Sequence, residues 1–260
     1  MKLTDWILLW TLSLLWGGSF LFNELALAGL PAISIVWGRV ALAAVLLSVA
    51  LRASGQGMPA RRVWPALAVM GLLNNLVPFT LFVLAQGQIT GALASVLNAT
   101  TPLFTVLVAH FATADERLTP AKAAGVGLGF AGVVVMMVGE NLGGELLAIL
   151  ACLGAALSYG LAGVWGRRFR AAGLTPMQTA FGMVTASAVC LTPVWLVVDQ
   201  PWALGWPGVS PVLAVVGLAS LSSALAYLIF FRILARAGAV AISLVTFLIP
   251  FSAAGLGWLV

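Results

Sequence analysis

Long apolar runs alternate with short polar connections along the whole chain. Nine of these runs are long enough to cross a lipid bilayer, because a membrane-spanning helix needs about 20 residues at a rise of about 1.5 Å each. They cover residues 5–23, 32–52, 64–85, 91–112, 120–139, 145–166, 177–198, 209–231 and 237–260. The pattern predicts an all-α integral membrane protein with nine transmembrane helices and no inserted soluble domain.

The composition agrees with a membrane protein. Of the 260 residues, 62% are hydrophobic and 7% are charged, whereas a soluble domain carries about 25% charged residues. The basic residues stand singly or in small groups between the apolar runs, so the high isoelectric point does not indicate nucleic-acid binding. Cys152 and Cys190 both lie inside apolar runs, where packing is a simpler role than a disulfide.

The charged residues predict the orientation of the chain. If the N-terminus with Lys2 lies in the cytoplasm, eleven of the twelve basic residues fall on that side, and the twelfth, Arg39, lies within the second run. Besides Lys2, the cytoplasmic set is Arg52, Arg61, Arg62, Arg117, Lys122, Arg167, Arg168, Arg170, Arg232 and Arg236, and the acidic outer set is Glu24, Glu140, Glu145 and Asp199. This positive-inside pattern predicts a multi-pass protein of the inner (plasma) membrane with a cytoplasmic N-terminus. A signal peptide cleaved near residues 26–28 is the alternative, but the first apolar run is long for that role.

The polar residues inside the apolar runs repeat at a fixed interval. Pro102 and Pro250 lie in the middle of the fourth and ninth runs, 148 residues apart. The same interval pairs Asn74 and Asn75 with Ser222 and Ser223, Phe79 with Tyr227, and Asn98 with Thr246. We therefore predict two five-helix repeats, residues 1–143 and 144–260. Because five is odd, the second repeat enters the membrane from the opposite side, which is the inverted layout of many secondary transporters. A tenth helix would start near residue 268, so it is expected to be missing from this chain.

The mid-membrane polar residues predict a central cavity. Transporter sites lie near the bilayer midplane between repeats, and polar groups in hydrocarbon need partners or water. The predicted substrate-binding residues are Trp16, Ser19, Asn74, Asn75, Pro78, Phe79, Asn98, Thr101, Tyr159, Ser222, Ser223, Tyr227 and Thr246. The alternative for each serine or threonine is a hydrogen bond that holds two helices together. Trp16 and Tyr159 are equally compatible with a place in the apolar core.

Ionisable side chains are few within the predicted helices. We expect a structural role for Arg39, which would extend to the outer interface or pair with Glu24. His110 is expected at the cytoplasmic interface rather than in a proton relay. Since we place no Asp, Glu, Lys or Arg at the midplane, the predicted cavity has no fixed charge. The glycines of the fifth run, between residues 125 and 132, indicate close helix packing.

Several motifs together resemble a known family. They are Trp16-Gly17-Gly18-Ser19, Pro31 followed by Arg39, the hairpin GALASVLNATTPLFTVLVAHF, then Glu116 and LTPAKAAGVGLGFAGVVVMM. In these features the chain resembles the EamA-type transporters of the drug/metabolite transporter superfamily, and among them the amino-acid exporters of the YddG type. The resemblance implies ten helices, alternating access and a cavity lined by helices 1, 3, 4, 6, 8 and 9. The tenth helix is the departure from that pattern.

Amides, hydroxyls and aromatic faces without fixed charge predict a carrier for small neutral or zwitterionic metabolites. Amino acids, aromatic and other neutral ones, are the favoured substrates, moved outwards by alternating access. Aromatic walls also suit cations, so an exporter of amphiphilic cations or drugs is the first alternative. A nucleotide-sugar carrier is the second, disfavoured because phosphate would need fixed positive charge. We expect no enzymatic activity, cofactor, metal or nucleic-acid partner, and a monomer embedded in the bilayer.

Overall fold

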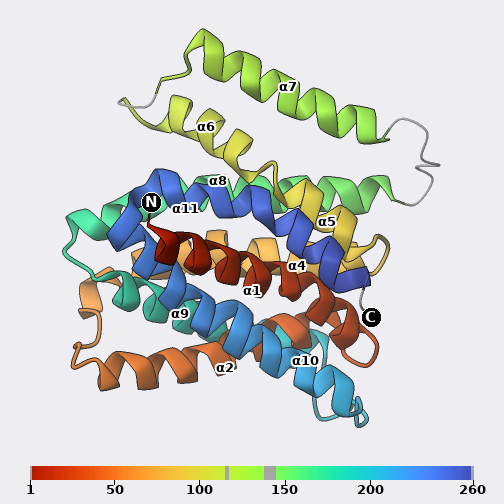
Figure 1. Ribbon diagram of the computed structural model, residues 1–260. Coiled ribbons are helices and arrows are strands. Elements are labelled where there is room, and N and C mark those ends of the chain that lie inside the picture. The colour runs from red at the N-terminus through yellow and green to blue at the C-terminus, as the bar shows by residue number, and fades with distance from the viewer. Residues whose placement is uncertain (1, 115–116, 138–144, 259–260) are drawn as a thin grey trace.

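The computed structural model describes residues 2–114, 117–137 and 145–258 (Figure 1). Its elements are α1 (Leu3–Leu27), α2 (Ala32–Ala53), η1 (Arg61–Val63), α3 (Trp64–Gly71), η2 (Leu72–Leu76), α4 (Val77–Gln86), α5 (Gly91–Asn98), α6 (Thr101–Ala112), α7 (Pro120–Met137), α8 (Leu146–Ala171), α9 (Pro176–Val198), α10 (Val209–Ala219), η3 (Ser220–Leu225) and α11 (Ala226–Trp258). The described residues form no strand. The prediction of an all-α membrane protein is confirmed. The predicted repeat boundary at 143/144, Glu116 and Glu140 lie outside the described residues.

Seven stretches of the described chain are helical, long and apolar enough to cross a membrane. They correspond to seven of the nine predicted runs. The other two runs, 120–139 and 237–260, are represented by the shorter apolar helices Pro120–Val135 and Val245–Trp258.

The last element, α11, folds back on itself. The Trp16 ring lies 5.8 Å from the Phe230 ring, and the next residue, Gly17, abuts Ser252. In a straight helix residues 230 and 252 would lie about 33 Å apart. Both touch neighbouring residues of α1, so α11 must bend, as Figure 1 shows near the N-terminus. It therefore combines the end of the eighth predicted run with the ninth.

The third and eighth predicted runs each contain a π-helical segment, η2 and η3. In η2 the Val77 N–H bonds to the Leu72 carbonyl, five residues back. Pro78 follows directly, and a proline lacks an N–H and crowds the carbonyl four residues before it, here that of Asn74. The two π-segments begin at residues 72 and 220, at the interval of 148 that the polar residues predicted.

The fourth predicted run is not one continuous helix. Helix α5 ends at Asn98, residues Ala99 and Thr100 form a turn, and α6 starts at Thr101 with Pro102 as its second residue. A proline is tolerated there because the first-turn N–H groups have no partner within the helix. The corresponding Pro250 lies inside α11, which continues past it.

Helix α1 packs against α10 and α11, while α2 packs on α9, and α8 packs on α4 and α6. Close approach of α1 and α11 depends on Gly17: a Cβ there would lie 2.7 Å from the Ser252 Cβ. The Oγ atoms of Ser13 and Ser252 lie 2.6 Å apart one turn away.

Helix α7 packs mainly on α6, and Figure 1 shows these two helices at one side of the bundle. The Phe104 and Phe130 rings meet there at 5.1 Å. The prediction that the α7 glycines serve close packing is largely wrong. A Cβ at Gly125, Gly127 or Gly132 would meet no described atom within 4 Å, and Gly129 alone of the four abuts a side chain, that of Leu103.

Candidate functional site

A cavity of about 850 Å³ lies inside the bundle. Side chains from α1, α2, α4, α8, α9 and α11 form most of its wall, together with the π-segments and the α5–α6 break. The resemblance implied walls from predicted helices 1, 3, 4, 6, 8 and 9. The second and seventh also contribute, through Arg39 of α2 and Thr179 and Met183 of α9.

The structure brings most of the predicted substrate-binding residues together. Ten of the thirteen line this cavity: Trp16, Ser19, Asn74, Phe79, Asn98, Thr101, Tyr159, Ser222, Tyr227 and Thr246. Asn75, Pro78 and Ser223 are buried but do not line it. Their positions suggest support of the wall, and contact of the other ten with a substrate stays a prediction.

The two adjacent asparagines have different surroundings. Asn75 is completely buried, and its Nδ2 donates to Ser187 Oγ at 3.0 Å. Ser187 in turn donates to the Met183 carbonyl at 2.7 Å. Tyr227 donates its hydroxyl proton to Asn75 Oδ1 at 3.1 Å. Asn74 is half-buried, and its Nδ2 donates to the Tyr227 hydroxyl at 3.2 Å.

This chain of bonds has a fixed direction. The Met183 carbonyl can only accept, so Ser187 must donate to it and must accept from Asn75. Asn75 Oδ1 then accepts from Tyr227, and the Tyr227 oxygen accepts from Asn74. The Asn74 amide is thereby oriented with Nδ2 toward the wall. Its Oδ1 accepts no hydrogen bond from any described residue, and Asn74 is one of the residues that line the cavity.

Arg39 is the residue whose role the sequence reasoning missed. Its side chain is 6% exposed and lines the cavity. Nε donates to Ser223 Oγ at 2.9 Å, and Cζ lies 3.6 Å from the centroid of the Phe79 ring. Glu24 instead accepts a hydrogen bond from the Gly91 N–H. The expectations that Arg39 pairs with Glu24 or reaches the interface, and that the cavity has no fixed charge, are therefore wrong.

Asn23 is a second polar residue of the wall that was missed. Its Nδ2 donates to Gln86 Oε1 at 2.8 Å, and Gln86 Nε2 donates to the Phe20 carbonyl at 2.8 Å. Asn23 Oδ1 is buried and accepts no hydrogen bond within the described part of the chain. The helical spacing from Trp16 through Phe20 to Asn23 was the available signal, because residues seven apart share one face.

Aromatic rings make up much of the remaining wall. The Phe20 and Phe82 rings meet edge to face at 5.6 Å, and Phe82 stacks on Tyr159 at 6.3 Å. Trp16 and Phe230 also line the cavity. Such rings combine large apolar contact area with specific geometry, so the wall suits a compact ligand that has an apolar or aromatic part.

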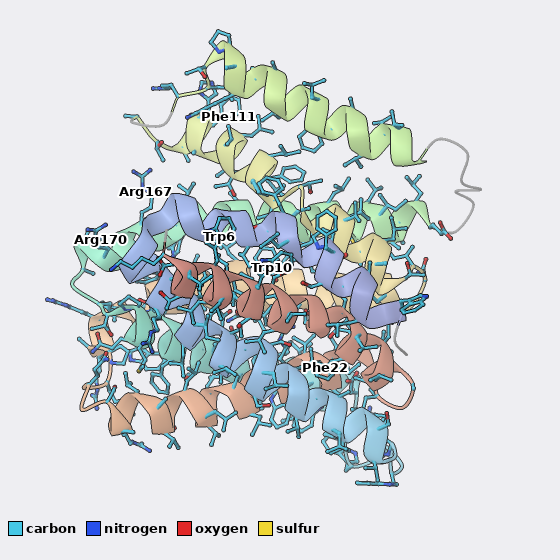
Figure 2. The ribbon with its side chains drawn as sticks, viewed as in Figure 1. Trp6, Trp10, Phe22, Phe111, Arg167 and Arg170 are labelled. Carbon is cyan, nitrogen blue, oxygen red and sulfur yellow. The ribbon has the colours of Figure 1, made fainter. Side chains whose placement is uncertain are left out.

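Basic residues gather at one end of the bundle. Figure 2 shows Arg167 and Arg170 at the end where Figure 1 marks the N-terminus. Arg170 also borders the cavity. Asp199 lies at the end of α9, where its carboxylate accepts hydrogen bonds from the Ser34 N–H at 2.6 Å and the Ser34 hydroxyl at 2.7 Å. The side chain of Arg236 lies outside the described parts.

A model of the EamA-like transporter family matches residues 5–138 and 146–260. The chain belongs to the EamA-like transporter family. It is therefore a membrane transporter, and the resemblance of its motifs to the EamA-type transporters is confirmed. This EamA-like transporter has the family model on each side of the short segment between residues 138 and 146.

Two relatives are similar to this chain in sequence. An uncharacterized inner membrane transporter, YedA, of Escherichia coli (strain K12) is 27% identical over 220 residues, which cover 84% of this chain and 70% of the relative. An uncharacterized transporter of Archaeoglobus fulgidus is 27% identical over 245 residues, covering 91% of this chain and 82% of the relative.

One solved crystal structure, described only as a protein, has the same fold. It superposes with a TM-score of 0.68 at 23% sequence identity, over 98% of this chain and 88% of that one.

Proposed function

We propose that this EamA-like transporter exports small zwitterionic metabolites, with neutral and aromatic amino acids as substrates, by alternating access through the central cavity. The observation that carries the proposal is the cavity itself: it combines amide and hydroxyl groups, aromatic rings and one buried guanidinium. Its volume of about 850 Å³ falls within the range of about 300–1,000 Å³ that is usual for small-molecule sites.

The positive charge of Arg39 in the cavity distinguishes between the alternative substrate classes. Arg39 repels cations, which weighs against an exporter of amphiphilic cations. A zwitterion offers a carboxylate to the guanidinium and keeps its net charge at zero. A nucleotide-sugar-type metabolite remains the second candidate, because both Arg39 and Arg170 border the cavity and arginine is a preferred phosphate ligand.

The inverted arrangement and the orientation are part of the same proposal. The basic end of the bundle, where α1 begins, would face the cytoplasm by the positive-inside rule. Helix α8, which begins the second matched segment, starts at the opposite end of the bundle, as Figure 1 shows. The name of YedA as an inner membrane transporter supports an inner-membrane location for this chain.

The breaks in the helices support alternating access. Discontinuous helices are common at transporter sites, and π-segments are frequent at functional positions. Here both π-segments and the α5–α6 break contribute residues to the cavity: Asn74, Ser222, Asn98 and Thr101. At these positions the regular α-helical hydrogen-bond pattern is interrupted.

Uptake into proteoliposomes tests the proposal. The full-length protein would be given labelled threonine, methionine, phenylalanine, tryptophan, a quaternary ammonium and a nucleotide-sugar, with protein-free liposomes as the control. We expect saturable uptake of the amino acids only. Uptake of the quaternary ammonium or the nucleotide-sugar without any amino acid would contradict the substrate assignment and leave the family assignment intact.

A further inference from the structure

Arg39 is a buried cation with unused donors. Its Nε is bonded to Ser223 and its face is covered by Phe79. Its two Nη groups donate to no described residue, and no described carboxylate lies within 4 Å of the guanidinium. A charged side chain inside a membrane protein is costly and is as a rule paired or functional. The guanidinium is therefore available to pair with an anion that enters the cavity.

The guanidinium is also held in place. Ser223 lies in η3 and fixes Nε, while Phe79 of α4 supports the planar face. With these two contacts made, the Nη atoms form the free end of the fork. That geometry matches the two oxygens of one carboxylate.

An unused acceptor belongs to Asn74, which is connected to the same part of the bundle through Tyr227. Ser223, the Arg39 partner, precedes Tyr227 by four residues, one helical turn, and Asn74 donates to the Tyr227 hydroxyl. The directed chain that starts at the Met183 carbonyl leaves Asn74 Oδ1 without a donor at the cavity wall. Among the described residues, the wall thus presents donors at Arg39 Nη and an acceptor at Asn74 Oδ1 that have no partner within the chain.

We propose that Arg39 binds the carboxylate of the transported metabolite and that Asn74 Oδ1 accepts a hydrogen bond from its ammonium group. The aromatic wall of Phe20, Phe82 and Tyr159 would receive the side chain. Ser223 is a positioning residue, because it touches Arg39 and not the cavity. The assignment rests on the proposed amino-acid substrate and says which chemical groups of it are recognised.

Three matched ligands separate the two contacts. L-Phenylalanine has both groups, 3-phenylpropionate lacks the ammonium, and phenethylamine lacks the carboxylate. Binding to purified full-length protein in detergent is measured by ligand-induced thermal stabilisation, which does not require transport. For the wild-type protein we expect L-phenylalanine to bind best, 3-phenylpropionate to bind more weakly and phenethylamine not to bind.

Two variants should then respond differently. Arg39→Gln should weaken both carboxylate ligands by about 10- to 100-fold, the usual loss for one charged hydrogen-bonding partner. Asn74→Ala should weaken L-phenylalanine by about 5- to 20-fold and leave 3-phenylpropionate unchanged. Ser223→Ala should lower the preference for carboxylates less than Arg39→Gln does, a selectivity change that loss of packing alone would not produce.

The matched control is Arg168→Gln. Arg168 also stacks on an aromatic ring, with Cζ 3.0 Å from the Trp165 centroid, but it is exposed and does not line the cavity. We expect the Arg168→Gln variant to show the same affinity pattern for the three ligands as the wild type. Arg39→Lys keeps the positive charge, so it tests whether an effect of Arg39→Gln comes from misfolding. This variant should bind the carboxylate ligands more weakly than the wild type and more strongly than Arg39→Gln.

Equal binding of phenethylamine and L-phenylalanine by the wild type would overturn the inference, as would unchanged carboxylate binding in a folded Arg39→Gln variant. Failure of both carboxylate ligands to bind the wild type would overturn it too. Failure of the proposed function has a different signature: Arg39-dependent binding of 3-phenylpropionate together with no amino-acid uptake would keep the carboxylate contact and remove the amino acid as substrate.

Discussion

Asn75→Ala tests whether the two adjacent asparagines have separate roles. Asn75 is completely buried and makes hydrogen bonds of 3.0 Å to Ser187 and 3.1 Å to Tyr227. Each such bond contributes about 0.6 to 1 kcal/mol in a helical membrane protein. Truncation also leaves partner groups and a small void behind, so we expect a total loss of about 2–3 kcal/mol. For a chain of this size that corresponds to roughly 5–10 °C in melting temperature.

The assay is thermal unfolding of the purified full-length protein in detergent, alongside two comparison variants. Asn74→Ala removes an amide that faces the cavity, so it should change melting temperature little and transport strongly. Thr185→Val replaces a buried hydroxyl that has no hydrogen-bond partner among the described residues. This isosteric change should be neutral or stabilising by up to about 1 kcal/mol. A melting temperature for Asn75→Ala equal to that of the wild type would refute the supporting role of Asn75.

Two further substitutions probe the packing and one helix end. Gly17→Ala places a Cβ 2.7 Å from the Ser252 Cβ, and overpacking of this kind should cost about 1–3 kcal/mol of stability. The same change at Gly18, where the nearest atom lies at 3.5 Å, should cost less. Equal melting temperatures for the two variants would show that α1 and α11 are free to separate. Asp199→Asn removes the negative charge of the carboxylate that accepts two hydrogen bonds from Ser34 in the first turn of α2. We expect the free energy of unfolding, measured by chemical denaturation, to fall by about 1 kcal/mol. A variant more stable than the wild type would contradict the capping role.

Much of the architecture could be predicted because hydrocarbon imposes simple rules. A span needs about 20 apolar residues, so the runs were visible, and polar residues inside them were noticeable because each must find a partner. Ten of the predicted residues therefore lie together at one cavity. The polar residues that repeat at the interval of 148 residues lie inside both π-segments, but the sequence pattern did not indicate that the helix is π-helical there.

The remaining details depend on packing, which the sequence does not display. Asn74 and Asn75 are adjacent and chemically identical, and neighbouring residues point about 100° apart on an α-helix. The contacts with Ser187 of α9 and Tyr227 of α11 decide that Asn75 is completely buried while Asn74 is half-buried. Arg39 was assigned to the interface because its depth could be counted but its direction could not. The bend of α11 was hidden for a similar reason: its backbone stays helical where two separate helices were expected.

The π-segments have a consequence for how this chain is compared with its relatives. A π-turn holds one residue more than the α-helical turn it replaces, and it rotates the faces before and after it by about 100°. In η2 this rotation lets α3 pack on α9 while α4 packs on α8. A relative that lacks the extra residue would show a one-residue gap in the middle of a membrane helix. Such a gap at residues 72–76 or 220–225 marks a real loss of the π-turn and a different cavity wall, so it should be retained when sequences of the family are aligned.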